Sequence, residues 1–201
     1  MKAILISIKP YWVAKILNGE KTIEIRKRFP KDYRGWVYIY CTKDKDFDLF
    51  YENGKYQAYF RHNRKSHIKR LRQEPLNGKV VARFWCGNVT EYINGGQWHE
   101  DNTFGNYDDY IKYKVCELAC VTEEELFDYC EDLAFSVIHI SQLEIFEEPK
   151  ELSEFKHYNK PSCDSCPFQY SCECDYHREV DCDDIPLTKA PQSWCYVEGG
   201  K

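Results

Sequence analysis

The stretch GEKTIEIR, residues 19–26, is the most informative part of this chain for its fold. A glycine turn leads into a short run in which Ile23 and Ile25 alternate with Glu24 and Arg26. Alternation with a period of two predicts a β-strand whose isoleucines enter a core while the charged side chains lie on the other face. Charge is therefore concentrated on a strand that a core should contain, and Lys21 stands just before it. We expect function at this point.

The flanking sequence predicts the order strand, helix, strand. Residues 1–8 are mostly apolar and favour a strand. Residues 10–19 carry proline near the start and glycine at the end, which is typical of a short helix. Trp12 falls on the apolar side of this helix, so the helix should cover the sheet and leave Lys21 between the two elements.

The pattern Gly19-x-Lys21-x-x-Glu24-x-Arg26 resembles the signature of the ASCH family, a branch of the PUA-like superfamily of small β-barrels. Residues 78–84 resemble the next barrel strand of that family, and residues 149–155 and 190–197 resemble the closing segments of a phage or bacterial subgroup. The resemblance covers roughly residues 1–155 and 188–198. It implies an α+β chain folded as a PUA-like β-barrel with short helices.

The rest of the chain fits one such domain over residues 1–201, with a cysteine-rich insertion at about 157–187. Aromatic and β-branched residues predict strands over 35–41, 79–92 and 135–146, the last ended by Pro149. Residues 122–125 form a Ser/Thr-x-x-Glu capping box and predict a helix start. Residues 42–77 are polar and aromatic, with Asn53-Gly54 as a turn, and are expected to join two barrel strands. Strands interrupted by helices favour a mostly antiparallel barrel over a doubly wound sheet.

The composition bounds the class of protein. No run approaches the ~18 apolar residues of a membrane span, so we expect a soluble cytoplasmic protein. Eleven cysteines in that compartment favour metal ligands or buried thiols over disulfides. The net charge of −5 does not by itself indicate a nucleic-acid-binding protein.

Residues 61–72 are rich in Lys and Arg and contain no acidic residue. They are the expected footprint for phosphate, and a solvated face is the alternative interpretation. The predicted nucleic-acid contacts are Arg61, Arg64, Lys65, Lys69 and Arg70.

Residues 163–182 hold five cysteines and a histidine among very few apolar residues. A metal would supply the missing cohesion, since Zn²⁺ is bound tetrahedrally by Cys and His, and Cys-x2-Cys presents two thiolates from one turn. The predicted structural zinc ligands are Cys163, Cys166, Cys172 and Cys182.

The fourth zinc ligand has two alternatives, Cys174 and His177. An iron–sulfur cluster is a rival because Cys-x2-Cys-Pro-x4-Cys resembles the cysteine-rich end of some nucleases, although no nuclease core is evident. Disulfides formed by oxidation, or no metal at all, are the remaining alternative.

The resemblance implies a ligand cleft between the first helix and the barrel wall. Lys21, Glu24 and Arg26 would line it, Trp12 or Tyr11 would stack on a base, and the ligand would be RNA or a modified nucleotide. A glutamate accepts from an exocyclic amine, and an arginine donates to a carbonyl or phosphate.

Two functions other than ligand binding are alternatives for this chain. Some ASCH members hydrolyse N4-acetylcytidine with a lysine at the position of Lys21 and a threonine three residues later, so Lys21 would be catalytic in such an amidohydrolase. This sequence has Glu24 at the threonine position, and Thr22 lies beside the lysine. The third possibility is an interaction or regulatory module.

Overall fold

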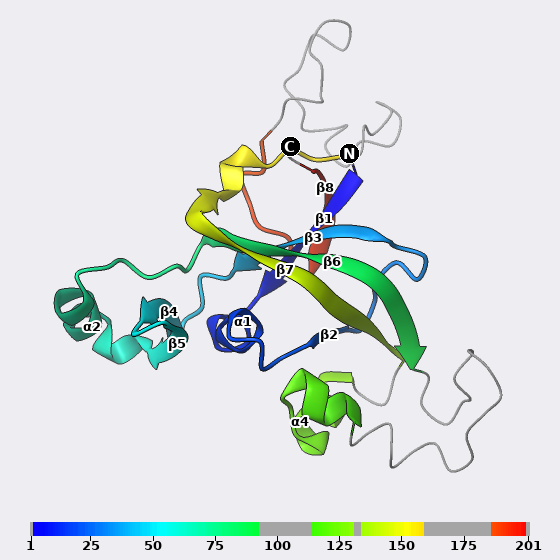
Figure 1. Cartoon of the computed structure of the whole chain (residues 1–201), viewed down its shortest axis with the longest axis horizontal. Helices are drawn as coiled ribbons and strands as arrows, with labels where there is room; N and C mark the ends of the chain where they lie inside the picture. The colour runs from blue at the N-terminus through cyan, green and yellow to red at the C-terminus, as the bar shows by residue number, and fades with distance from the viewer. Residues whose placement is uncertain (1, 93–113, 131–133, 159–185, 200–201) are drawn as a thin grey trace, which may run out of the picture.

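The computed structural model describes residues 2–92, 114–130, 134–158 and 186–199 (Figure 1). The elements and their bounds are β1 (Lys2–Ile8), α1 (Pro10–Leu17), β2 (Ile23–Arg26), β3 (Gly35–Cys41), β4 (Phe47–Glu52), β5 (Lys55–Phe60), the 3-10 turn η1 (Arg61–Asn63), α2 (Arg64–Leu71), β6 (Lys79–Tyr92), α4 (Glu123–Cys130), β7 (Phe135–Glu151), the 3-10 turn η2 (Leu152–Glu154) and β8 (Trp194–Glu198). The chain is α+β with a mainly β core, as predicted.

The central sheet has six strands in the order β2-β7-β6-β3-β1-β8. β1 and β3 run parallel and all other neighbours in this sheet are antiparallel. The parallel pair needs a crossover, which α1 and β2 supply. The long strands β6 and β7 curve across the molecule (Figure 1).

The predicted closed barrel is wrong for the described residues, because this sheet is open, with β2 and β8 at its edges. No ladder of backbone hydrogen bonds closes the described sheet, and side-chain hydrogen bonds span the gap instead. The Arg26 guanidinium donates to Ser7 O of β1 at 2.6 Å, and Trp194 Nε1 of β8 donates to Arg28 O at 2.8 Å. The alternating pattern could not decide this, because half-buried strands suit an open and a closed sheet equally.

The bounds of β3 and β6 are those predicted, and the capping box also forms, with Glu125 N donating to Thr122 Oγ1 at 3.1 Å. The predicted end of the last long strand at Pro149 is wrong, because β7 continues to Glu151. Pro149 falls in an irregular stretch, between the register pairs Val80–Lys150 and Ala82–Ile145. A proline is tolerated there because no ladder hydrogen bond needs its missing N–H.

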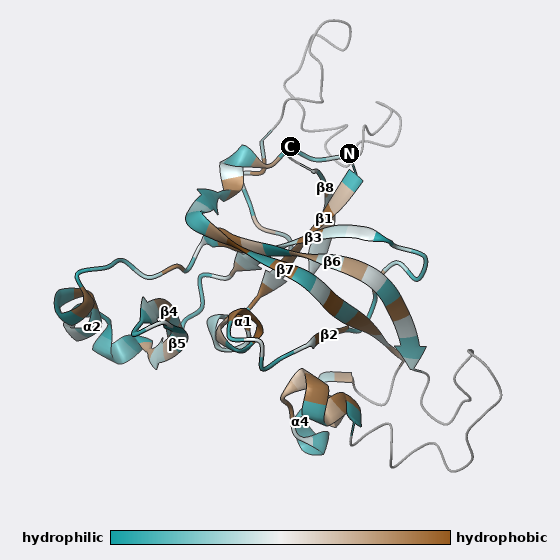
Figure 2. Ribbon diagram, in the orientation of Figure 1, coloured by the Kyte–Doolittle hydropathy of each residue, from teal (hydrophilic) through white to brown (hydrophobic). Residues whose placement is uncertain are grey.

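Three apolar clusters hold the molecule together, and Figure 2 shows brown residues along β6 and β7 and a mostly teal α2. The largest lies between the sheet and α1 and includes Ile4, Val13 and Phe84, all fully buried. A second joins β2 to α4 through Ile23 and Leu126. The third lies on the opposite face of β1 and β3 and includes Leu5 and Tyr38.

Residues 42–77 form a unit of their own, the β4–β5 hairpin with α2. α1 packs against one face of the hairpin and α2 lies on the other. Two asparagine amides occupy its edges: Asn18 exchanges hydrogen bonds with the Tyr56 backbone, and Asn77 bonds Leu49 N and Phe47 O. Pairing the edges in this way leaves fewer free backbone groups for another chain.

Candidate functional site

The turn after α1 leads directly into the charged residues of the signature, which begin at Lys21. Gly19 has φ of 75°, in the left-handed region that favours glycine, and Glu20 N donates to Lys15 O at 2.9 Å. Such a helix end turns the chain back along the helix. Lys21 is thereby placed beneath α1, and Thr22 N bonds Leu118 O at 3.0 Å just before β2 begins.

We call Lys21, Glu24 and Arg26 the signature cluster. Glu24 lies between the two cations: its Oε2 is 3.5 Å from Lys21 Nζ and its Oε1 is 3.1 Å from Arg26 Nη2. The exposed side-chain fractions are 4%, 7% and 12% in chain order, so the three charged groups meet in a largely buried setting. Charges buried in this way must meet partners, because desolvating an unpaired ion is costly.

Backbone carbonyls from distant segments satisfy the cations further. Lys21 Nζ donates to Ala119 O at 2.9 Å, and Arg26 Nη2 donates to Ser7 O at 2.6 Å. Arg26 Nε is buried and has no hydrogen-bond partner among the described residues. Two formal positive charges thus face one negative charge, and one buried N–H of a cation is left over.

The indole of Trp12 lies on the α1 side of the cluster. Lys21 Nζ is 5.4 Å from its ring centroid, within cation–π range. Tyr11 meets Trp12 edge to face, with 4.7 Å between centroids. Trp12 is half-buried and packs against the main core cluster.

The cluster does not assemble the parts of a hydrolase. Thr22 is exposed, and none of the hydrogen bonds found among the described residues joins its hydroxyl to Lys21. Lys21 directs its donors to Ala119 O and the Glu24 carboxylate. The geometry therefore gives no support to a hydroxyl nucleophile activated by Lys21.

The predicted basic contacts divide into two groups on the hairpin unit. Arg64 Nη1 lies 3.5 Å from Asp48 Oδ1, Arg70 forms a paired ion contact with Glu52, and Arg61 donates to Asp44 O. Each of these three arginines fixes η1 or α2 to β4 or to the loop before it.

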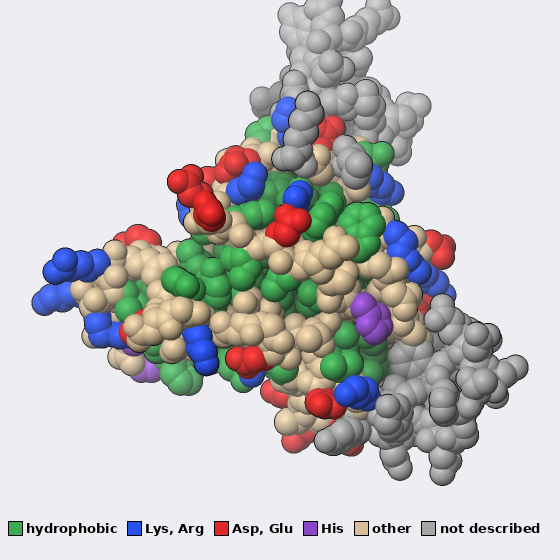
Figure 3. Space-filling model, viewed as in Figure 1, with side chains coloured by type: hydrophobic (Ala, Val, Ile, Leu, Met, Phe, Trp, Pro, Cys, Tyr) green, Lys and Arg blue, Asp and Glu red, His purple; other side chains and the backbone are tan. Residues whose placement is uncertain are grey.

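Lys65 and Lys69 are exposed on α2 and take part in no ion pair between described residues. Figure 3 shows Lys and Arg side chains gathered at the end of the molecule that α2 forms. Of the five predicted contacts, these two lysines are the ones whose charge is not paired with an acid or a carbonyl among the described residues.

Asp48 of β4 is a buried charge that reasoning from the sequence does not select. It is 1% exposed, and neither carboxylate oxygen has a hydrogen-bond partner among the described residues. Burial raises the pKa of Asp48, and the charges of Arg64 and Arg61 oppose that rise. Its position on an ordinary alternating strand, between Phe47 and Leu49, does not predict such deep burial.

The predicted zinc ligands Cys163, Cys166, Cys172 and Cys182 lie outside the described residues, as do the alternatives Cys174 and His177. Within the described ranges no group of three or more His, Cys, Asp or Glu is placed to hold a metal ion. The described cysteines are free thiols, and burial raises the pKa of Cys86 and Cys130 to about 11. In the same ranges no helix is long and apolar enough to cross a membrane.

No protein-family model matches the sequence, and no curated protein matches it. Among solved structures, a single-site mutant of the ASCH protein from Zymomonas mobilis is similar, with TM-score 0.47 and 14% identity over 76% of this chain and 77% of that one. The unsubstituted Zymomonas protein gives TM-score 0.45 and 14% identity over 75% and 73%. These neighbours are ASCH domain proteins, the family whose signature residues 19–26 resemble.

Proposed function

We propose that this chain is an ASCH domain protein of the PUA-like superfamily that binds nucleic acid or a nucleotide at the signature cluster, with RNA or a modified nucleotide as the ligand. One observation carries the proposal. A buried cluster with two cations and one anion retains the N–H of Arg26 Nε without a described partner. A buried donor of this kind is costly unless an acceptor reaches it.

The donors and acceptors of the cluster suit a base or a phosphate. Arginine donates in a planar fork to carbonyl or phosphate oxygens, and Glu24 would accept from an exocyclic amine. Trp12 offers an aromatic surface 5.4 Å from Lys21 Nζ. Aromatic stacking combined with hydrogen bonds to base edges is the usual way that proteins hold unpaired RNA bases.

The basic segment supports a ligand that extends beyond one nucleotide. Lys65 and Lys69 are exposed on α2, away from the cluster, and attraction to phosphates there would be independent of sequence. The net charge of −5 makes this local patch more important for phosphate binding than the overall charge.

Arg26→Lys tests the proposal because it keeps the charge beside Glu24 and removes the N–H of Nε. Affinity for uridine monophosphate and for a fluorescein-labelled oligouridylate should fall by about 1–3 kcal/mol, measured by calorimetry and anisotropy. Arg83→Lys is the matched control, since Arg83 pairs with Glu144 and lies 4.2 Å over Trp36, elsewhere on the sheet. Equal affinities for wild type and both variants, or no nucleotide binding by wild type, would reject the proposal.

The cysteine-rich residues 163–182 are proposed to hold one structural zinc ion through Cys163, Cys166, Cys172 and Cys182. Support comes from five thiols in a segment with few apolar residues. Protein purified under reducing conditions without chelator should contain about one zinc per chain by elemental analysis. Metal-free protein that is fully folded would exclude the site, and iron with visible absorbance would identify the rival cluster.

A further inference from the structure

Five ring-bearing side chains form a continuous line that leads away from the signature cluster. We call them the aromatic stripe: Trp12 and Tyr11 on α1, Phe47 on β4, Phe60 on β5 and His62 on η1. Successive ring centroids are separated by 4.7, 5.8, 4.8 and 5.6 Å. The first ring, Trp12, lies over Lys21 and the last lies on the turn that begins α2.

Two rings of the stripe are strongly exposed to solvent. Phe60 is 58% exposed and Tyr11 is 42% exposed. Phe47 and Phe60 are cross-strand partners on the hairpin face that α1 covers, and the next pair, Leu49 and Ala58, belongs to the main core cluster or packs against it. The exposed rings are therefore the uncovered end of a face that is otherwise buried.

Basic side chains accompany the stripe along the sequence. Lys9 stands two residues before Tyr11, Lys45 stands two residues before Phe47, and both are exposed with no ion pair among the described residues. Lys15 lies 5.4 Å from the Tyr11 centroid while it also pairs with Glu20.

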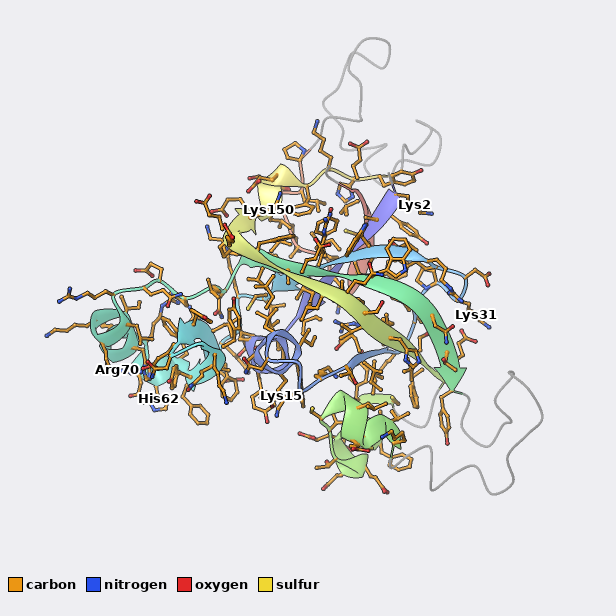
Figure 4. All side chains as sticks on the ribbon, in the orientation of Figure 1. Lys2, Lys15, Lys31, His62, Arg70 and Lys150 are labelled. Atoms are coloured by element: carbon orange, nitrogen blue, oxygen red, sulfur yellow. The ribbon has the colours of Figure 1, made fainter. Side chains whose placement is uncertain are left out.

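One acid, Asp46, is exposed beside Phe47, so the charge of the stripe is not uniform. Figure 4 shows Lys15 and His62 along one side of the molecule, with Arg70 of α2 beyond His62. The stripe thus runs between the signature cluster and the basic segment.

We propose that the aromatic stripe is a stacking platform for single-stranded nucleic acid, with successive bases stacked on Tyr11 and Phe60 and the strand running from the signature cluster to α2. This inference rests on the proposed function and specifies its ligand class. Aromatic rings beside lysines suit single strands of any sequence because every base has a stacking face. Duplexes do not offer that face, so they are excluded from this surface.

The test compares Phe60→Ala with Tyr51→Ala in the full-length chain. Tyr51 is 48% exposed and lies on the same face of the hairpin, at its other end beside the Asn53-Gly54 turn, so it controls for loss of an exposed ring. The probes are a fluorescein-labelled oligouridylate of about twelve nucleotides, the DNA counterpart, and uridine monophosphate. Thermal unfolding followed by circular dichroism verifies that both variants are folded.

Phe60→Ala should weaken oligonucleotide binding by about 5- to 100-fold and leave uridine monophosphate binding unchanged, while Tyr51→Ala changes neither. Phe60→Trp should restore affinity, and Phe60→Leu should not, because leucine keeps the apolar bulk without a stacking face. Oligonucleotide binding that Phe60→Ala leaves intact, or that Phe60→Leu restores, would overturn the inference.

Three further outcomes distinguish failure of this inference from failure of the proposed function. Oligonucleotide binding that responds to Arg26→Lys and not to Phe60→Ala removes the stripe and leaves the proposed function standing. Absence of binding to every nucleotide probe removes both. Binding of wild type, lost in Phe60→Ala, to vesicles of phosphatidylcholine and phosphatidylserine with no effect on RNA would assign the stripe to a membrane surface and overturn the inference.

Discussion

Glu24 and Asp48 are two buried carboxylates in the two charged regions of this protein, and their surroundings differ. Glu24 has a cation on each side, at 3.1 and 3.5 Å. Asp48 is buried still more deeply. Among the described residues its one ion pair is with Arg64 at 3.5 Å, and neither of its oxygens has a hydrogen bond. Glu24 neutralises part of the positive charge of Lys21 and Arg26. Asp48 is instead a buried negative charge that a single ion pair compensates incompletely.

The comparison shows that burial alone does not tell what a charge contributes. A buried carboxylate between two cations is needed, because its removal leaves like charges together in a dry site. A buried carboxylate with one long contact is a net cost to folding, and it is retained only where something else requires it. Opposite signs are therefore expected when each acid is neutralised.

Glu24→Gln should have the largest effect. It leaves Lys21 and Arg26 buried without their anion and should destabilise the fold by about 3 kcal/mol, the lower end for broken buried pairs because the amide still accepts one hydrogen bond. That corresponds to about 6–12 °C in Tm for a chain of this size.

Glu144→Gln is the control for this change, because Glu144 pairs with Arg83 and is 47% exposed. Its effect should be within about 1 kcal/mol. Similar losses for the two variants would remove the distinction between the buried and the exposed pair.

Asp48→Asn should act in the opposite direction and stabilise the protein by about 1 kcal/mol at neutral pH, or about 2–4 °C in Tm. The amide costs less to bury than the carboxylate, and Arg64, which is 34% exposed, stays solvated without its anionic partner. Denaturant titration at pH 7 measures the difference. A destabilised Asp48→Asn variant would mean that the Arg64 contact outweighs desolvation.

The difference in stability between wild type and Asp48→Asn should depend on pH. Burial raises the pKa of Asp48 in the folded state, so the folded protein binds its proton more tightly than the unfolded chain does. Wild type then loses stability relative to Asp48→Asn as pH rises through the unfolded pKa of about 3.9 and the higher folded pKa. Asp44 and Glu74 add to the rise, while Arg64 and Arg61 oppose it. The difference between the two unfolding curves should be smallest at the acidic end, and a difference that shrinks toward neutral pH would contradict the assignment.

Lys65→Glu with Lys69→Glu should have the smallest effect on stability, within about 0.5 kcal/mol, because both side chains are exposed. The effect on binding is electrostatic. The slope of log affinity against log salt should decrease by about 0.7 for each phosphate of a single strand that the variant no longer neutralises. An unchanged slope would return this part of α2 to a solvated face.

Much of the fold is predictable from residue patterns that act locally. The alternation over residues 35–41 and the capping box at Thr122 depend on near neighbours, and both are confirmed. The closed barrel depends on whether two distant edges meet, and here Arg26 and Trp194 fill the opening with side-chain hydrogen bonds. Strand patterns carry no information about that choice.

The candidate site shows the same division. The two-residue spacing of Glu24 and Arg26 predicts that they share a face of the strand, with Lys21 just before it, and the three side chains do meet. The acceptors Ser7 O and Ala119 O could not be predicted, because backbone carbonyls leave no trace in residue types. The pattern of residues 42–77 predicts only a connection, whereas their hairpin brings Phe60 beside Phe47 and Asp48 beneath Arg64.

The N–H resonance of Arg26 Nε reports directly on whether a nucleotide reaches the signature cluster. In a ¹⁵N-edited NMR spectrum of the full chain, this resonance is assigned by its disappearance in Arg26→Lys, and uridine monophosphate is then titrated. We expect it to shift and to saturate with the same Kd as calorimetry gives, while the Nε resonance of Arg83 stays in place. Saturating nucleotide that shifts other resonances and leaves Arg26 Nε unmoved would contradict binding at this cluster.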